Sequence, residues 1–248
     1  AVLAPTFSEY ANAVRAFGGE VGYVFDFAAA ERAVCGGAKT VFVCAPNNPD
    51  GAMPSRGEVF SFADACAASG ARLFLDACFY DFVDDPEFSL TELFALPNVL
   101  VLQALTKSCA LAGVRLGYLM GASEELQRIS EKSQPWNVSS LAQAAGAAAA
   151  VDRRYFGLLR ETVRTERAFL EDALRRAGYA PFPSRANFLL FEGEQDLAAR
   201  LKERGIAIRD CGDFAGLTPA AGKRYYRIGV RTHAENEALR RALLKEKE

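Results

Sequence analysis

Three groups of polar residues follow apolar stretches that are typical of buried strands. They are Asn47–Gly51 after TVFVCAP, Asp76 at the end of RLFLD, and Thr106–Lys107 after NVLVLQAL. A carboxylate and an amine can hold and transfer protons, and a lysine amine can also form an imine with an aldehyde. Taken singly, each group has an ordinary explanation, because strand ends often carry polar residues. Together they predict a site, since the carboxyl ends of parallel strands lie at one edge of a sheet.

This combination of groups meets a definite chemical need. A pyridoxal cofactor requires a lysine for its Schiff base and a carboxylate that keeps the pyridine nitrogen protonated, so that the ring can accept electrons. Lys107 and Asp76 are the candidates for these two roles. We expect Lys107 to be buried between apolar strands, where desolvation lowers the pKa of its amine. Arg115 is a candidate phosphate ligand, and the alternative for it is an ordinary surface arginine.

Three segments resemble the signature segments of fold-type-I aminotransferases, which depend on pyridoxal phosphate. They occur in the family's order and spacing, and they read APNNPDG (45–51), LTKSCALAGVRLGY (105–118) and YYRIGVRT (225–232). The resemblance extends over nearly the whole chain, and it falls in the branch that holds histidinol-phosphate aminotransferase and threonine-phosphate decarboxylase. It implies an enzyme with the α/β, aspartate aminotransferase-like fold and with pyridoxal 5'-phosphate as its cofactor.

The resemblance also implies a role for each matching residue. It makes Lys107 the Schiff-base lysine and Asp76 the partner of the ring nitrogen. The other implied cofactor contacts are Phe7 stacked on the ring, Asn48 at the phenolic oxygen, Thr106 beside the lysine and Arg115 at the phosphate. The implied clamp for the substrate α-carboxylate is Arg227, because a guanidinium suits a planar carboxylate better than lysine does. Further candidates for substrate binding are Asn187, Arg209 and Arg231. No metal is expected.

The sequence departs from the family pattern in two places. Where the branch has Asp-Glu-Ala-Tyr, this chain has Asp76 followed by Ala-Cys-Phe, so that Phe79 replaces the tyrosine; phenylalanine is associated with the decarboxylases. The second departure is at the start of the sequence, where the resemblance leads us to expect that the family's N-terminal portion is missing. In relatives this portion supplies an N-terminal arm, a backbone turn for the cofactor phosphate and a tyrosine that crosses the dimer.

The resemblance leaves three hypotheses for the reaction. The first is decarboxylation of O-phospho-L-threonine in cobalamin biosynthesis, because Gln134–Val138 and IRDCGDF resemble segments of the decarboxylase. The second is transamination of histidinol phosphate or a related amino acid. The third is a truncated, catalytically inactive fragment. Trp136 is expected to line the pocket or to fill a domain interface.

The elements that must position these residues follow from the hydrophobic pattern. Apolar runs at 40–46, 72–78, 98–105 and 114–121 alternate with helical patterns, which predicts a mostly parallel sheet with helices on both faces. Helices are expected to dominate from Glu124 to Gly178, and shorter strands are expected at 187–192, 206–210 and 224–231. We therefore predict a large cofactor-binding domain at 1–150, lacking its N-terminal portion, and a small α+β domain at 151–248, joined by a long helix.

The composition excludes several other classes of protein. The 29 basic and 31 acidic side chains nearly cancel, and no basic cluster suggests nucleic-acid binding. No apolar run reaches the length of a membrane span and no signal peptide is recognised, so a cytoplasmic location is expected. The six cysteines include no Cys-x-x-Cys pair, so we expect them to be reduced and structural. His233 is the only histidine of the sequence, which excludes a histidine-based catalytic triad. The expected partners are a small amino acid phosphate and a second copy of the chain in a homodimer.

Overall fold

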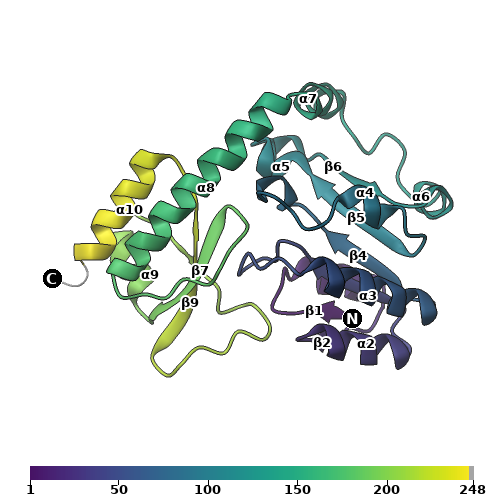
Figure 1. The fold of residues 1–248 in the computed structure, drawn as a ribbon, viewed down its shortest axis with the longest axis horizontal. Helices are drawn as coiled ribbons and strands as arrows, with labels where there is room; N and C mark the ends of the chain where they lie inside the picture. The colour runs from purple at the N-terminus through teal and green to yellow at the C-terminus, as the bar shows by residue number, and fades with distance from the viewer. Residues whose placement is uncertain (246–248) are drawn as a thin grey trace.

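The computed structural model describes residues 1–245 of the chain and, over these residues, contains two sheets (Figure 1). The larger sheet has six strands in the order β2-β1-β3-β4-β5-β6. Its strands are β1 (Val2–Leu3), β2 (Tyr23–Val24), β3 (Thr40–Cys44), β4 (Arg72–Asp76), β5 (Val99–Ala104) and β6 (Gly117–Met120). Neighbouring strands are parallel except β6, which runs antiparallel to β5. The expectation of a parallel strand at 114–121 is wrong in direction, because the connection through residues 105–116 returns the chain beside β5 without crossing the sheet.

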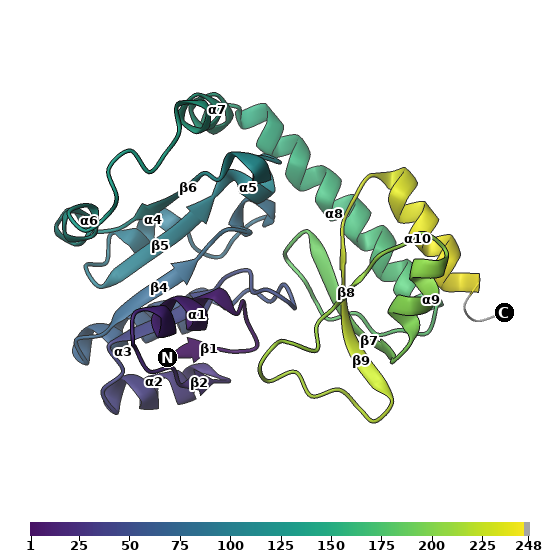
Figure 2. The same cartoon turned by 180° about the vertical axis from the view of Figure 1, so that it is seen from behind.

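Helices lie on both faces of this sheet. Figure 1 shows α3 in front of the strands, and Figure 2, seen from behind, shows α1 on the opposite side. Several helices of this part begin at a capping side chain; Ser55 and Glu58, for example, form a reciprocal capping box at the start of α3. The helices of this part are α1 (Glu9–Ala16), α2 (Phe27–Cys35), α3 (Arg56–Ala68), α4 (Leu90–Phe94), α5 (Leu105–Ser108), α6 (Ser123–Ser130) and α7 (Ser140–Ala150), with 3₁₀ turns η1 (Tyr80–Phe82) and η2 (Ala112–Val114).

The two faces of the larger sheet differ in burial. On the face covered by α2, α3 and α4, the side chains of β3 and β4 are fully buried and form the core with those helices. On the other face, Phe42 and Phe74 stack on each other, with ring centroids 5.1 Å apart, and are only partly buried. The two faces of β3 and β4 are therefore buried to different extents. This second face is the one on which Asp76 lies, two residues beyond Phe74.

The smaller sheet is antiparallel, with strand order β7-β9-β8. It consists of β7 (Phe188–Glu194), β8 (Arg209–Asp210) and β9 (Lys223–Gly229), and its helices are α8 (Arg153–Arg176), α9 (Leu197–Glu203) and α10 (His233–Lys245). A separate hydrophobic core joins this sheet to α8, α9 and α10. The strand expected at 206–210 shortens to its last two residues, and the apolar residues 206–208 belong to the loop that follows the turn at Gly205.

The long helix α8 runs from the end of α7 beside α5 to the smaller sheet (Figure 2). We propose that the separate cores correspond to two domains, residues 1–150 and 151–248, with α8 as the connection. Within the described residues, no helix combines the length and the apolarity that crossing a membrane requires.

Candidate active site

Asp76 stands at the carboxyl end of β4, in the middle of the larger sheet. Its backbone is in register with Cys44 on β3 and Leu102 on β5. The carboxylate accepts hydrogen bonds on both oxygens: Oδ1 from the backbone N–H of Cys78 at 2.9 Å, and Oδ2 from the hydroxyl of Tyr10. The acid predicted from the sequence is therefore held in a fixed orientation at the edge where a site was expected.

Lys107 lies on α5, a single helical turn that starts as soon as β5 ends. Its side chain is exposed, so the expectation that it is buried between apolar strands is wrong. The physical reason is that the chain leaves the sheet plane one residue after β5. The next residue, Ser108, is buried and its carbonyl accepts a 2.6 Å hydrogen bond from the Tyr155 hydroxyl of α8, which fixes the turn.

The pKa of the Cys78 thiol depends on its burial and on two charged groups of the candidate site. Burial raises the pKa of this thiol well above its usual value, and the carboxylate of Asp76 raises it further. The ammonium of Lys107 acts on the same pKa in the opposite direction. The electrostatic effects of the acid and of the amine therefore both reach the sulfur of Cys78.

Asn48 and Arg227 come from different sheets and meet at this edge. Asn48 is buried in the loop after β3, and its Oδ1 accepts a hydrogen bond from the guanidinium of Arg227 on β9. The same guanidinium lies 4.8 Å from the ring centroid of Phe188, in a cation–π contact. Burial lowers the pKa of Arg227. A partly desolvated guanidinium of this kind gains strongly from a carboxylate partner.

The loop that carries Asn48 is braced against the smaller sheet. Gly51 adopts φ +74°, and a Cβ there would lie 2.0 Å from the Ser184 hydroxyl oxygen. The carbonyl of Gly51 accepts a 2.8 Å hydrogen bond from the backbone N–H of Arg185. Glycine is therefore required both for the left-handed turn and for the close approach of the two segments. This contact sets the position of Asn48 relative to Arg227.

The remaining predicted cofactor contacts lie around the same edge but have few neighbours. Phe7 is 42% exposed and makes an edge contact with Tyr10, with centroids 5.8 Å apart. Thr106 is half-buried on α5. Arg115 is exposed in a left-handed turn, and it donates a 3.1 Å hydrogen bond to the carbonyl of Ala112. Their roles toward a ligand stay predictions.

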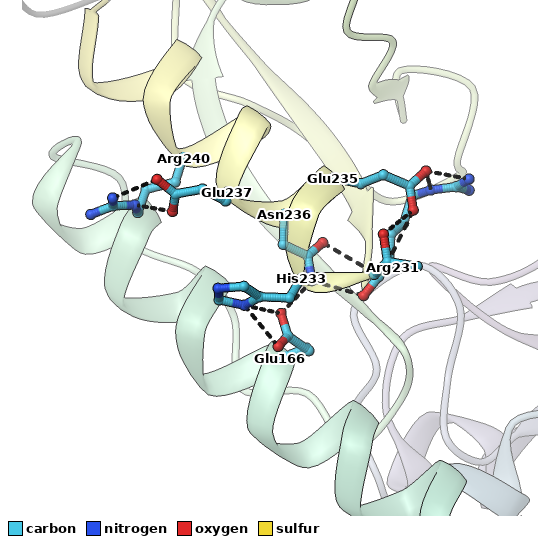
Figure 3. A network of polar contacts seen from close by, with 8 residues as sticks. Glu166, Arg231, His233, Glu235, Asn236, Glu237 and Arg240 are labelled. Atoms are coloured by element: carbon cyan, nitrogen blue, oxygen red, sulfur yellow. Dashed lines mark hydrogen bonds and ion pairs between the residues drawn. The ribbon is translucent and has the colours of Figure 1, made fainter.

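Arg231 is engaged in a network at the start of α10 (Figure 3). It forms a 2.8 Å ion pair with Glu235, while its backbone N–H donates to Asn236. Asn236 and His233 both contact Glu166 of α8, at 2.8 and 3.0 Å. The network explains the positions of Arg231 and His233 by helix capping and helix packing. A substrate role for Arg231 stays a prediction.

Three further residues that the sequence singled out lie in different surroundings; they are Asn187, Arg209 and Trp136. Asn187 precedes β7, and its Oδ1 is buried without a hydrogen-bond partner among the described residues, so that a ligand donor would satisfy it. Arg209 is exposed and pairs with Asp213 at 2.5 Å. Trp136 is 98% exposed, so the expectation that it lines a pocket or fills an interface is wrong for this chain.

Sequence reasoning missed Tyr10 as a member of the site. The only sequence signal for Tyr10 is its spacing of three residues from Phe7, which favours two side chains on one side of the chain near the start of a helix. Such a spacing is common and does not by itself indicate a site. Phe79, recognised only as a departure, packs edge-on against Phe188 at 5.0 Å. Through Phe188 it supports the apolar surface beneath the guanidinium of Arg227.

Comparisons with known proteins show the family and the fold of the chain. The family described as aminotransferase class I and II matches residues 1–243. Threonine-phosphate decarboxylase of Salmonella typhimurium is 34% identical over 98% of this chain and 69% of its own length. Histidinol-phosphate aminotransferase of Symbiobacterium thermophilum is 33% identical over 96% of this chain and 68% of its own. The crystal structure of histidinol-phosphate aminotransferase from Clostridium acetobutylicum has a TM-score of 0.91 and 23% identity, covering 99% of this chain and 77% of that one.

The chain belongs to the class I and II aminotransferase family, whose enzymes use pyridoxal phosphate. Its fold is the aspartate aminotransferase-like fold. The chain spans about two thirds of the length of the curated relatives that it matches.

The donor set fits the cofactor of this family. A carboxylate with both oxygens fixed suits a protonated ring nitrogen, and an exposed amine after the neighbouring strand suits an aldehyde. A buried amide suits the ring oxygen, and the exposed guanidinium of Arg115 suits a phosphate. The residues present at the sheet edge are therefore chemically matched to pyridoxal phosphate.

Proposed function

We propose that this chain is a pyridoxal-phosphate enzyme that decarboxylates an amino acid phosphate, with O-phospho-L-threonine as the substrate. The observation that carries the proposal is the contact between Arg227 and Asn48. It brings a guanidinium suited to the substrate α-carboxylate beside an amide suited to the cofactor ring. The likeness to the decarboxylase of Salmonella typhimurium, at 34% identity, supports the choice of reaction.

Each residue has a definite task in this proposal. Bound pyridoxal phosphate supplies the electron sink for the bond that breaks at the substrate Cα. Asp76 would hold the proton on the ring nitrogen, and Arg227 would orient the carboxylate. Lys107 would bind the cofactor and then return a proton to Cα; it follows β5, the strand next to the one that ends at Asp76.

Transamination of histidinol phosphate is the second candidate. It is favoured by the 33% identity to the enzyme of Symbiobacterium thermophilum. The same residues serve either reaction, because the Cα bond held perpendicular to the conjugated plane is the one that breaks. A cytoplasmic location, a homodimer and a place in cobalamin biosynthesis stay predictions that rest on the resemblance.

A pair of assays tests the proposed reaction. The protein supplied with pyridoxal phosphate is given O-phospho-L-threonine, and release of CO₂ is measured; in parallel it is given histidinol phosphate with 2-oxoglutarate, and formation of glutamate is measured. We expect CO₂ release in the first assay and at most a trace of glutamate in the second. Glutamate without CO₂ would establish the second candidate instead.

A further inference from the structure

The side chain of Tyr10 is held firmly on the face of the larger sheet that carries Asp76. It is 7% exposed, and its ring stacks on Phe42 with centroids 5.3 Å apart and planes 7° from parallel. Phe7 contacts the ring from the side. Because the ring is packed on two sides, the position of its hydroxyl is set by the fold and needs no rearrangement to act on a neighbour.

The hydroxyl of Tyr10 donates to one oxygen of Asp76 while the backbone N–H of Cys78 donates to the other. A carboxylate with a single donor can rotate about its Cβ–Cγ bond, whereas donors on both oxygens fix its plane. Both donors are neutral, so the negative charge of Asp76 is not cancelled by a fixed cation at these positions. The carboxylate therefore keeps its attraction for a protonated ligand nitrogen.

The protonation state of Tyr10 suits this task. Burial raises the pKa of the phenol well above its usual value, and the nearby acidic groups of Cys44 and Asp76 raise it further. The hydroxyl accordingly keeps its proton at neutral pH. It acts toward Asp76 as a hydrogen-bond donor and does not become a competing anion.

We propose that Tyr10 is the positioning residue that orients the Asp76 carboxylate toward the ring nitrogen of the cofactor. This inference rests on the proposed function, because it requires Asp76 to be the ring-nitrogen partner. It assigns to Tyr10 a role beyond packing, carried by one hydroxyl group. The ring would still stack on Phe42 without it, so the two roles can be separated by a substitution that removes the hydroxyl alone.

The test uses two ligands that differ only at the ring nitrogen. Dissociation constants are measured by absorbance titration for pyridoxal phosphate and for its 1-deaza analogue, in which carbon replaces the ring nitrogen. We expect the unaltered protein to bind pyridoxal phosphate more tightly than the analogue. Tyr10→Phe should weaken binding of pyridoxal phosphate by roughly tenfold, the loss typical of one hydrogen bond to a charged group, and leave binding of the analogue unchanged.

Matched variants separate positioning from a general loss of structure. Tyr226→Phe also removes a buried tyrosine hydroxyl, which bonds the carbonyls of Glu194 and Gln195 at 2.8 and 2.9 Å in the smaller sheet's core. It should leave the preference between the two ligands unchanged. In the Asp76→Asn background, Tyr10→Phe should have little further effect on that preference, because the residue through which it acts has already been altered.

The outcomes distinguish failure of this inference from failure of the proposed function. If Tyr10→Phe weakens the binding of both ligands equally, or of neither, the hydroxyl does not orient Asp76. The inference is then overturned, while the proposed function stands. If the unaltered protein binds neither ligand, or binds both equally well, Asp76 is not the ring-nitrogen partner. Both proposals then fall.

Discussion

At the scale of single residues, the candidate site depends on side chains whose freedom has been removed by their neighbours. Asp76 accepts hydrogen bonds on both oxygens, and Arg227 is held between Asn48 and the ring of Phe188. The cation–π contact and the amide orient the guanidinium without neutralising it. A charged group that is oriented but not neutralised can bind a ligand of opposite charge without first breaking an ion pair.

Arg227→Lys tests the proposed role of this guanidinium. Lysine keeps the charge but cannot form two parallel hydrogen bonds with a carboxylate, so we expect KM for the amino acid substrate to rise roughly 10- to 100-fold, with a smaller change in kcat. The matched control is Arg224→Lys, because Arg224 lies on the same strand as Arg227 but is paired with Asp210 at 3.1 Å and has no assigned role in the site. Equal changes in KM for the two variants would contradict the assigned role.

At the scale of elements, the site is formed by the loops and turns that follow parallel strands. The loop after β3 carries Asn48, the end of β4 carries Asp76, and the turn α5 after β5 carries Lys107. Tyr155 of α8 fixes α5 through the carbonyl of Ser108. The strands thus set the spacing of the groups, and the connecting segments set their orientation.

Gly51→Ala tests the bracing of the Asn48 loop. The left-handed backbone costs about 1–2 kcal/mol for alanine, and the steric conflict with Ser184 adds about 1–3 kcal/mol, so the free energy of unfolding should fall by about 2–5 kcal/mol. Gly70→Ala is the matched control, since Gly70 has φ +66° but open space around a Cβ. Chemical denaturation of both variants gives the comparison; equal losses would show that the close approach to Ser184 contributes nothing.

The sequence was sufficient to predict most elements of this scale and several of the site positions. The positions of Asp76 and of the loop that carries Asn48 at strand ends were predicted from the apolar runs before them, whereas the role of Asn48 came from the resemblance alone. The direction of β6 was missed, because an apolar run carries no information about strand direction. The exposure of Lys107 was also missed, since a four-residue helix is too short to show a period. Tyr10 was missed because its bond to Asp76 joins residues 66 positions apart.

At the scale of the whole molecule, the candidate site lies between two parts of the chain, each of which has its own hydrophobic core. The core of the larger sheet lies with α2, α3 and α4, and that of the smaller sheet lies with α8, α9 and α10. The contacts Arg227–Asn48 and Arg185–Gly51 connect the two parts at the carboxyl edge of the larger sheet. Ligands in α/β proteins bind preferentially at such an edge. The arrangement therefore allows a group from each part to act on one bound molecule.

Capture of pyridoxal phosphate by Lys107 is the most direct test of this account. The protein is mixed with the cofactor, its visible absorption is recorded, and the sample is reduced with borohydride and analysed by peptide mass spectrometry. We predict a visible band and the reduced cofactor's mass on the Lys107 peptide; both should be lost in Lys107→Ala and kept in Lys132→Ala, which removes another exposed lysine. A protein that shows no band, or that carries the label on other lysines while Lys107→Ala still binds, would contradict the account.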